Sequence, residues 1–182
     1  MRDGGRKVWR GLRPATAALV LALVATAGAG AGNSMASTGW TLDQLVRLSP
    51  AELEGLYASA SVGQLPSGKA SGRAILFGGS RLSGPASKVG RAFWQGKVFS
   101  PEEGRAVNRF FGIKSVPAAL GYGPSWRDGN QAIILDYAET SRLYAPYRDE
   151  IREVSPGLFL GLMFDRRTQP PKLALYFALE MR

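Results

Sequence analysis

The chain has 182 residues and contains neither cysteine nor histidine. This composition excludes disulfide bonds, thiolate nucleophiles and histidine-based acid–base or metal chemistry, while the length suffices for one domain with a hydrophobic core. Five of the 23 basic residues and one of the 14 acidic residues lie within residues 2–13, which leaves 18 and 13 in the remainder. That excess of five describes a mildly basic surface and does not indicate nucleic-acid binding.

The N-terminal segment has the pattern of a secretory signal peptide. Cations cluster in residues 2–13, an apolar run covers residues 15–27, and small residues follow as far as Ala31. Such a short apolar run fits a cleaved signal, because a membrane span needs about 20 apolar residues. We predict a signal peptide over residues 1–31, a flexible linker over residues 32–40, and a mature protein that is periplasmic or secreted. A retained membrane anchor is the alternative.

Residues 41–58 are predicted to form two short helices. Thr41 and Gln44, and then Ser49 and Glu52, have the spacing of a capping box, in which each side chain bonds the other residue's backbone N–H. Apolar residues recur on one side of both segments, so we expect the helices to pack on a sheet as a plug or lid.

The rest of the chain alternates strand-like segments with turn residues, and residues 78–90 form a Gly- and Ser-rich loop. Parallel strands need long crossovers, so short turns predict antiparallel neighbours. Closure into a barrel buries one face and protects the edges. We therefore predict one mainly β domain over residues 41–182, an antiparallel up-and-down (lipocalin-like) barrel of about 7–8 strands, with a two-sheet sandwich as the alternative. The expected strands cover residues 72–77, 93–99, 106–122 (two strands), 131–138, 147–154, 158–164 and 173–180.

The densest charge cluster lies in the strand expected at residues 147–154. Alternation along a strand places Arg148, Glu150 and Arg152 on one face. If that face is the interior, the three charges form an internal polar network, and if it faces outward they form a solvent-exposed ladder. A tight turn at residues 155–157 then sets them opposite large apolar residues of the next strand. The expected pairs are Arg148 with Phe164, Glu150 with Leu162, Arg152 with Leu160 and Val154 with Leu158.

Further candidates come from polar or aromatic residues in apolar surroundings. Asp136 sits in a segment that is apolar on both faces, and a hairpin brings it close to Arg148, so we expect either a structural ion pair or a ligand contact. Trp94 precedes Gly96, which would let another backbone or a ligand approach, although core packing is the simpler role. The predicted ligand-binding residues are Trp94, Asp136, Tyr137, Arg148, Glu150 and Arg152.

Known catalytic motifs are missing from the sequence. There is no G-x-S-x-G, no phosphate-binding loop and no calcium-binding loop. The sequence therefore predicts no catalytic residue, no metal site and no cofactor.

Four segments resemble bacterial GXWXG-type proteins, which are small lipocalin-like β-barrels. The segments are residues 93–99, 133–137, 160–164 and 176–180. The resemblance covers about residues 90–182 and departs at the motif that names the family, because Gly90 stands four residues before Trp94 and only W-x-G is matched. It implies a barrel and, at most, an apolar cavity for a small molecule.

Three functions are compatible with these observations. The first is a non-catalytic, extracytoplasmic β-barrel that binds a hydrophobic or amphipathic small molecule. The second is a pocket enzyme of the isomerase or cyclase type, using Asp136 or Glu150 with Tyr and Arg side chains. The third is an envelope interaction protein with a filled barrel, whose exposed face includes Trp126 and residues 166–167. Membrane contact is expected only through an uncleaved leader or weak surface charge, and the oligomeric state is not predicted.

Overall fold

The computed structural model describes residues 39–75 and 93–182. The predicted signal peptide, residues 32–38 of the linker and the loop at residues 78–90 lie outside the described residues. Among the helices that are described, none is long and apolar enough to cross a membrane.

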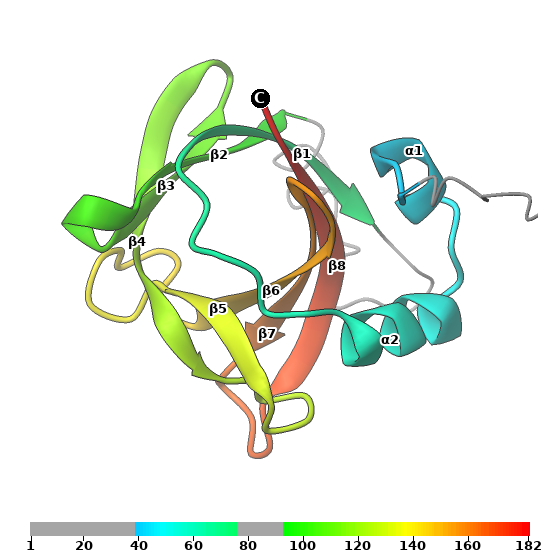
Figure 1. Ribbon diagram of the computed structural model, residues 1–182. Helices are drawn as coiled ribbons and strands as arrows, with labels where there is room; N and C mark the ends of the chain where they lie inside the picture. Colours follow the sequence, from blue (N-terminus) through cyan, green and yellow to red (C-terminus); the bar gives the residue numbers. More distant parts are fainter. Residues whose placement is uncertain (1–38, 76–92) are drawn as a thin grey trace, which may run out of the picture. The chain divides into compact units, whose positions relative to one another are not determined.

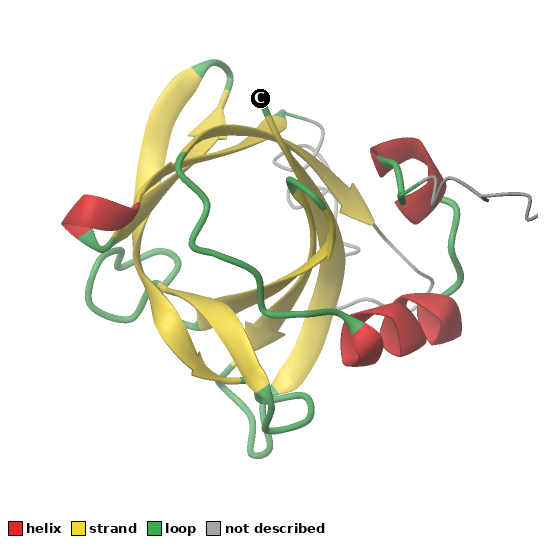
Figure 2. Cartoon of the chain, viewed as in Figure 1, coloured by secondary structure: helices red, strands yellow, loops and turns green. Residues whose placement is uncertain are grey.

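The described chain forms a closed barrel of eight antiparallel strands, as predicted (Figures 1 and 2). Each strand pairs with the next in sequence, and β1 closes the barrel against β8. Closure leaves the sheet without a free edge strand. The strands are β1 Gly68–Ile75, β2 Trp94–Ser100, β3 Arg105–Phe110, β4 Ile113–Pro124, β5 Gln131–Asp136, β6 Tyr147–Ser155, β7 Leu158–Asp165 and β8 Lys172–Met181.

The expected strand pair within residues 106–122 divides at a two-residue turn. Phe111 and Gly112 both have positive φ, of 51° and 79°, a conformation that reverses the chain between β3 and β4. A short 3-10 helix, η1 (Pro101–Glu103), separates β2 from β3.

Side chains of alternate strand residues fill the interior of the barrel. This interior cluster is apolar and contains large aromatic and aliphatic side chains. Its buried members are Ala70, Phe99, Ala106, Ala118, Leu120, Ile133, Leu135, Tyr137, Ile151, Phe159, Leu175, Phe177 and Leu179.

The two predicted helices, α1 (Leu42–Leu45) and α2 (Pro50–Ser59), cover the outer face of the barrel instead of plugging it (Figure 1). Both capping boxes are formed, at Thr41 and at Ser49. Leu45 and Leu53 are buried against outward-facing residues of β7 and β8. Burial of such a side chain contributes about 2 kcal/mol, so the helices and this outer face stabilise each other.

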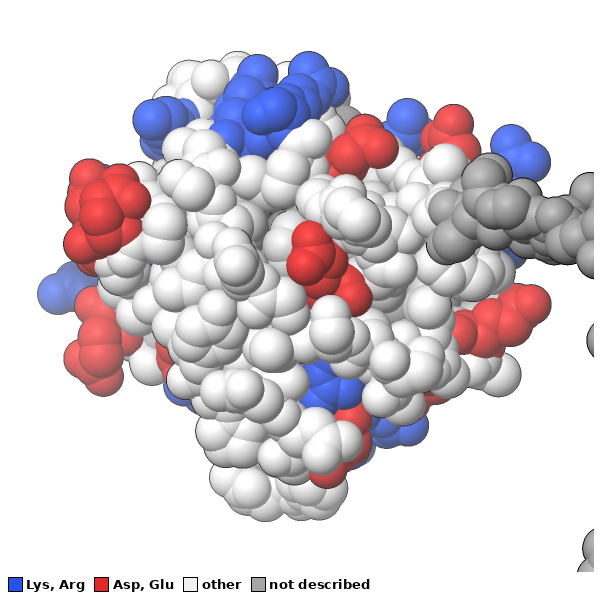
Figure 3. Space-filling view, viewed as in Figure 1, with Lys and Arg blue, Asp and Glu red and all other residues white. Residues whose placement is uncertain are grey.

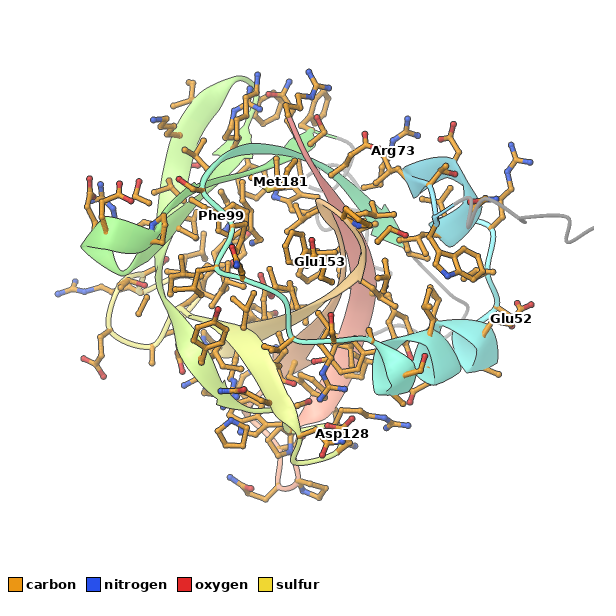
Figure 4. The ribbon with its side chains drawn as sticks, viewed as in Figure 1. Glu52, Arg73, Phe99, Asp128, Glu153 and Met181 are labelled. Carbon is orange, nitrogen blue, oxygen red and sulfur yellow. The ribbon has the colours of Figure 1, made fainter. Side chains whose placement is uncertain are left out.

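The segment after α2 crosses one end of the barrel (Figure 1). Ser61 forms an isolated antiparallel bridge with Glu153, and the Tyr122 hydroxyl donates to the carbonyl of Gly63 at 3.2 Å. Phe99 and Glu153 project into the barrel at this end, whereas Arg73 and Asp128 lie outside it (Figure 4). The interior is therefore capped by backbone at the end where β1 begins.

Candidate functional site

A lysine ammonium lies inside the barrel. Lys97 faces inward from β2, and its side chain is only 2% exposed. Its Nζ atom lies 2.7 Å from Asn108 Oδ1, 2.7 Å from the Tyr137 hydroxyl and 2.8 Å from Asp149 Oδ2. Because an ammonium has three N–H donors, these three acceptors satisfy it completely.

The partners of Lys97 are bonded to one another. The Tyr137 hydroxyl donates to Asp149 Oδ2 at 2.7 Å and accepts from Asn108 Nδ2 at 3.0 Å. The indole N–H of Trp94 donates to Asn108 Oδ1 at 2.9 Å. The five residues come from β2, β3, the residue after β5, and β6, and we call them the Lys97 centre.

One polar atom of the Lys97 centre has no partner. Asp149 Oδ1 makes no hydrogen bond with any described residue. Water cannot easily reach it, because the side chain is only 5% exposed. A buried acceptor without a donor costs about 1–3 kcal/mol. The centre can therefore accept one more hydrogen bond from a group that enters the interior.

Burial controls the ionisation of the centre. It lowers the pKa of Lys97, and the neighbouring Asp149 carboxylate opposes that change. It also raises the pKa of Tyr137 well above its ordinary value, and the Asp149 charge adds to the effect. Tyr137 is therefore a neutral donor at physiological pH. The rings of Trp94, Tyr137 and Phe177 each lie 5.5 Å from the Lys97 Nζ atom, within the range of cation–π attraction.

Aromatic rings surround the centre at the end of the barrel where β5 finishes and β6 begins. Tyr144 lies 5.6 Å from Tyr137, 5.9 Å from Tyr147 and 6.4 Å from Phe110, measured between ring centroids. Phe110, Tyr144 and Tyr147 are only partly buried. This end of the barrel thus offers ring faces and edges beside a polar anchor.

Two of the six predicted site residues, Trp94 and Tyr137, belong to the Lys97 centre. The other four, Asp136, Arg148, Glu150 and Arg152, face outward, because they alternate with the inward-facing Tyr137, Asp149 and Ile151. They form neither the internal network nor the solvent-exposed ladder that the sequence suggested. Glu150 and Arg152 are buried outside the barrel, beneath α2 and the connection between β4 and β5.

Glu150 is the centre of this outer group. Its carboxylate accepts from the Ser125 hydroxyl and from the backbone N–H of Trp126, the latter at 2.8 Å. Arg148 Nη2 lies 3.3 Å from the same carboxylate, and the Arg148 guanidinium stacks on Trp126 at 4.3 Å. Burial raises the pKa of Glu150 despite these bonds.

Asp136 lies opposite Arg148 in the β5–β6 ladder, as the sequence predicted, but its ion-pair partner is Arg166. Arg166 Nη2 lies 2.6 Å from Asp136 Oδ1, and the guanidinium also approaches Trp126 at 5.4 Å. Trp126, proposed from sequence as an exposed contact residue, is 37% exposed. Its ring packs against the guanidinium groups of Arg148 and Arg166. These contacts join β5 and β6 to the connection between β7 and β8.

The sequence analysis missed Lys97, Asn108 and Asp149. Asp149 carried one usable signal, since it alternates with Tyr147 and Ile151 on a single face of its strand. Lys97 and Asn108 carried no such signal, because nothing in the sequence around either residue indicates that the two side chains meet. Among the described residues, no group of His, Cys, Asp or Glu could hold a metal ion.

Comparison with known proteins does not assign a family. No family model matches the chain, and no curated protein matches it. A crystal structure of a protein from Thermomonospora curvata is similar, with 18% sequence identity and a TM-score of 0.48, over 74% of this chain and 88% of that chain. The case for a function therefore rests on the residues inside the barrel.

Proposed function

We propose that this protein binds a small amphipathic molecule inside its barrel and that the Lys97 centre is the polar anchor of the site. The body of the ligand would pack among the aromatic residues where β5 ends and β6 begins. Small barrels of about eight strands hold a single small ligand in several protein families.

The observation that supports this proposal is the unpartnered oxygen of Asp149. A buried ion pair is often no more stabilising than apolar residues of the same size, so the Lys97–Asp149 pair gains little for the fold itself. A ligand hydroxyl or N–H that donates to Asp149 Oδ1 would complete the network. The ligand is therefore a largely apolar molecule with one hydrogen-bond donor.

The surroundings of the anchor agree with such a ligand. Phe110, Tyr144 and Tyr147 supply apolar ring surfaces, and the two tyrosines add a hydroxyl each. The leader pattern in residues 1–31 extends the proposal to binding outside the cytoplasm, and the resemblance to GXWXG-type barrels is in keeping with it.

Two probes, an alcohol and its methyl ether, test the anchor. Decanol and decyl methyl ether differ in the donor but share the apolar chain, and each would be titrated against Nile red bound to the protein. Decanol should displace the dye about tenfold more effectively, the effect of one hydrogen bond to a charged acceptor. The preference should vanish in the double variant Lys97→Met with Asp149→Leu. Equal displacement by both probes in the native protein would overturn the anchor.

Native mass spectrometry of the protein purified from its own compartment provides a second test. A co-purifying molecule with one donor group and an apolar body is the expected result. Repeated recovery of ligand-free protein, together with no Nile red binding, would contradict an interior binding site.

A second candidate function is proton transfer at a bound carbonyl compound. It is favoured by the 2.7 Å hydrogen bond that the Lys97 ammonium, whose pKa is lowered by burial, donates to the neutral Tyr137 hydroxyl. Such an enzyme would exchange the protons beside the carbonyl of a long-chain methyl ketone in deuterated water. Tyr137→Phe should abolish that exchange, and a native rate no faster than the variant's would exclude this function.

A further inference from the structure

The described ladder between β1 and β2 is shorter than either strand. The β1–β2 ladder ends at Ser71 opposite Gly96. Strand β1 nevertheless continues along β8 as far as Ile75, and β2 begins at Trp94. Among residues 68–75 and 94–100, no ladder pairs β1 with β2 beyond Ser71 and Gly96, and we call this junction the β1–β2 seam.

Trp94 fills this seam. A Cβ atom built on Gly72 would lie 2.6 Å from Cη2 of the Trp94 ring, so the ring packs directly on the backbone of β1. Gly96 has φ of 109°, and a Cβ there would lie 2.2 Å from the carbonyl oxygen of Ala70. Only glycine permits both the close approach and this backbone conformation.

The same tryptophan belongs to the Lys97 centre. Its indole N–H bonds Asn108 inside the barrel, and its ring meets Phe177 edge-on at 5.7 Å. Trp94 also lines an open groove on the outer side of β1, beside α1, with a volume of about 990 Å³. One side chain therefore separates an external groove from the buried centre.

The groove carries more positive than negative charge. Lys69, Arg73 and Arg182 make no ion pair with any described residue, and Arg73 points away from the barrel towards α1 (Figure 4). Basic side chains also gather near the C-terminus in Figure 3. The charged residues that line the groove are Lys69, Arg73, Arg109 and Arg182, with Asp43 and Glu180.

We propose that the groove and the Lys97 centre are two parts of one binding site, joined through the β1–β2 seam at Trp94. The ligand class is an elongated amphipathic anion that carries a second, donor group, such as a hydroxylated long-chain acid. Its acidic group lies among the cations of the groove, its body passes Trp94, and its hydroxyl reaches Asp149 Oδ1. This inference rests on the proposed binding function and specifies its ligand and its route.

The charge of the ligand is tested with an ω-hydroxy fatty acid and its methyl ester, each titrated against bound Nile red. Replacing Arg73→Gln and Arg109→Gln together should weaken binding of the acid about fivefold and leave the ester unchanged, since two partly exposed charge contacts are lost. The matched control removes two half-exposed cations outside the groove, Arg105→Gln and Arg127→Gln, and should leave both affinities unchanged. Equal weakening of acid and ester, or no weakening of either, would overturn the groove as part of the site.

The route is tested by stopped-flow kinetics with the same acid. Trp94→Ala should raise the association and dissociation rates together by about fivefold, because one aromatic packing contact no longer closes the seam. Trp94→Phe keeps a ring in the seam and should restore the slow association and dissociation rates. This variant also distinguishes an effect of the missing ring from loss of the fold. Unchanged rates in a folded Trp94→Ala protein would overturn the route.

Failure of the anchor and failure of the route would give different results. If decanol and its ether bind alike, the anchor at Asp149 is wrong. If the alcohol preference is present but the groove and Trp94 variants have no effect, the anchor stands and the route through the seam is wrong.

Discussion

Lys97 on β2 and Asp149 on β6 meet across the interior of the barrel, with Nζ 2.8 Å from Oδ2. The two strands are not neighbours in the sheet, so this ion pair ties opposite walls together. Both side chains are almost fully buried; Tyr137 is hydrogen-bonded to both of them, and Asn108 accepts from Lys97. The pair therefore affects both stability and the chemistry of the interior.

Removal of one partner should destabilise the protein far more than removal of both. Lys97→Met leaves an uncompensated buried carboxylate and should lower the free energy of unfolding by about 3–5 kcal/mol. Adding Asp149→Leu should recover much of that loss, with a coupling free energy of about 1–3 kcal/mol in a double-mutant cycle measured by urea denaturation.

The exposed pair of Glu103 and Arg105 is the matched control for that cycle. Both side chains are about half exposed, so the corresponding cycle with Glu103→Gln and Arg105→Gln should give a coupling below about 1 kcal/mol. If the effects of Lys97→Met and Asp149→Leu simply add, the buried pair does not act as a unit.

Glu150 should make the protein less stable as pH rises. Its pKa is raised by burial in the folded state, so between the ordinary value of 4.5 and the raised value the folded protein binds more protons than the unfolded chain. The favourable contribution of the neutral carboxyl is complete below that window and is lost as pH rises through it. Relative to Glu150→Gln, the native protein should therefore lose stability from acidic to neutral pH in urea titrations.

Asp128 provides a control of opposite sign. The Arg152 guanidinium lowers the pKa of this carboxyl, so its contribution is present above the ordinary value of 3.8 and is lost as pH falls through the lowered value. Native protein compared with Asp128→Asn should gain stability as pH rises from strongly acidic values. Parallel pH profiles for the two variants would contradict the opposite environments of Glu150 and Asp128.

The register of the last strands was predictable because local signals determine it. The turn at residues 155–157 and the alternation of β6 place Arg148, Glu150 and Arg152 opposite Phe164, Leu162 and Leu160, as observed. The expected pair of Val154 with Leu158 was wrong by one residue, since a bulge between Glu153 and Ser155 sets Ser155 opposite Leu158.

The inward face of these strands could not be predicted from alternation. In β7, Phe159 and Met163 belong to the interior cluster, but Leu160 and Leu162 are equally buried beneath the helices on the outside. Because both faces are apolar, alternation shows which residues share a face but does not show which face points into the barrel. Lys97 and Asp149 are 52 residues apart, and only closure of the barrel brings them together.

Arg152 should be the strongest link between the barrel and its outer elements. Its guanidinium makes two bonds to Asp128, at 2.8 and 2.7 Å, and also donates to the carbonyl of Tyr57 in α2 at 3.0 Å. A lysine cannot reproduce this planar, bidentate contact. Arg152→Lys should therefore lower the free energy of unfolding by about 2 kcal/mol in urea denaturation.

Arg127 is the control for that substitution, because it is about half exposed and forms an ion pair with Glu54 of α2. Arg127→Lys should cost less than about 1 kcal/mol. Equal losses in the two variants would mean that the fork geometry at Arg152 contributes nothing beyond its charge.

Gly161 should tolerate no side chain, since it lies beneath the ring of Phe177 inside the barrel. A Cβ atom at this position would lie 2.2–2.6 Å from three ring carbons of Phe177. Gly161→Ala should therefore destabilise the protein by about 1–3 kcal/mol through overpacking, measured by thermal and urea unfolding. A second change, Phe177→Leu, removes the ring and should lower the free energy of unfolding less in the Gly161→Ala protein than in the native one.

Gly121→Ala on β4, where no atom lies within 4 Å of the new Cβ, should be neutral. Equal effects at Gly161 and Gly121 would show that Phe177 can move aside freely, and the interior next to Trp94 would then be loosely packed.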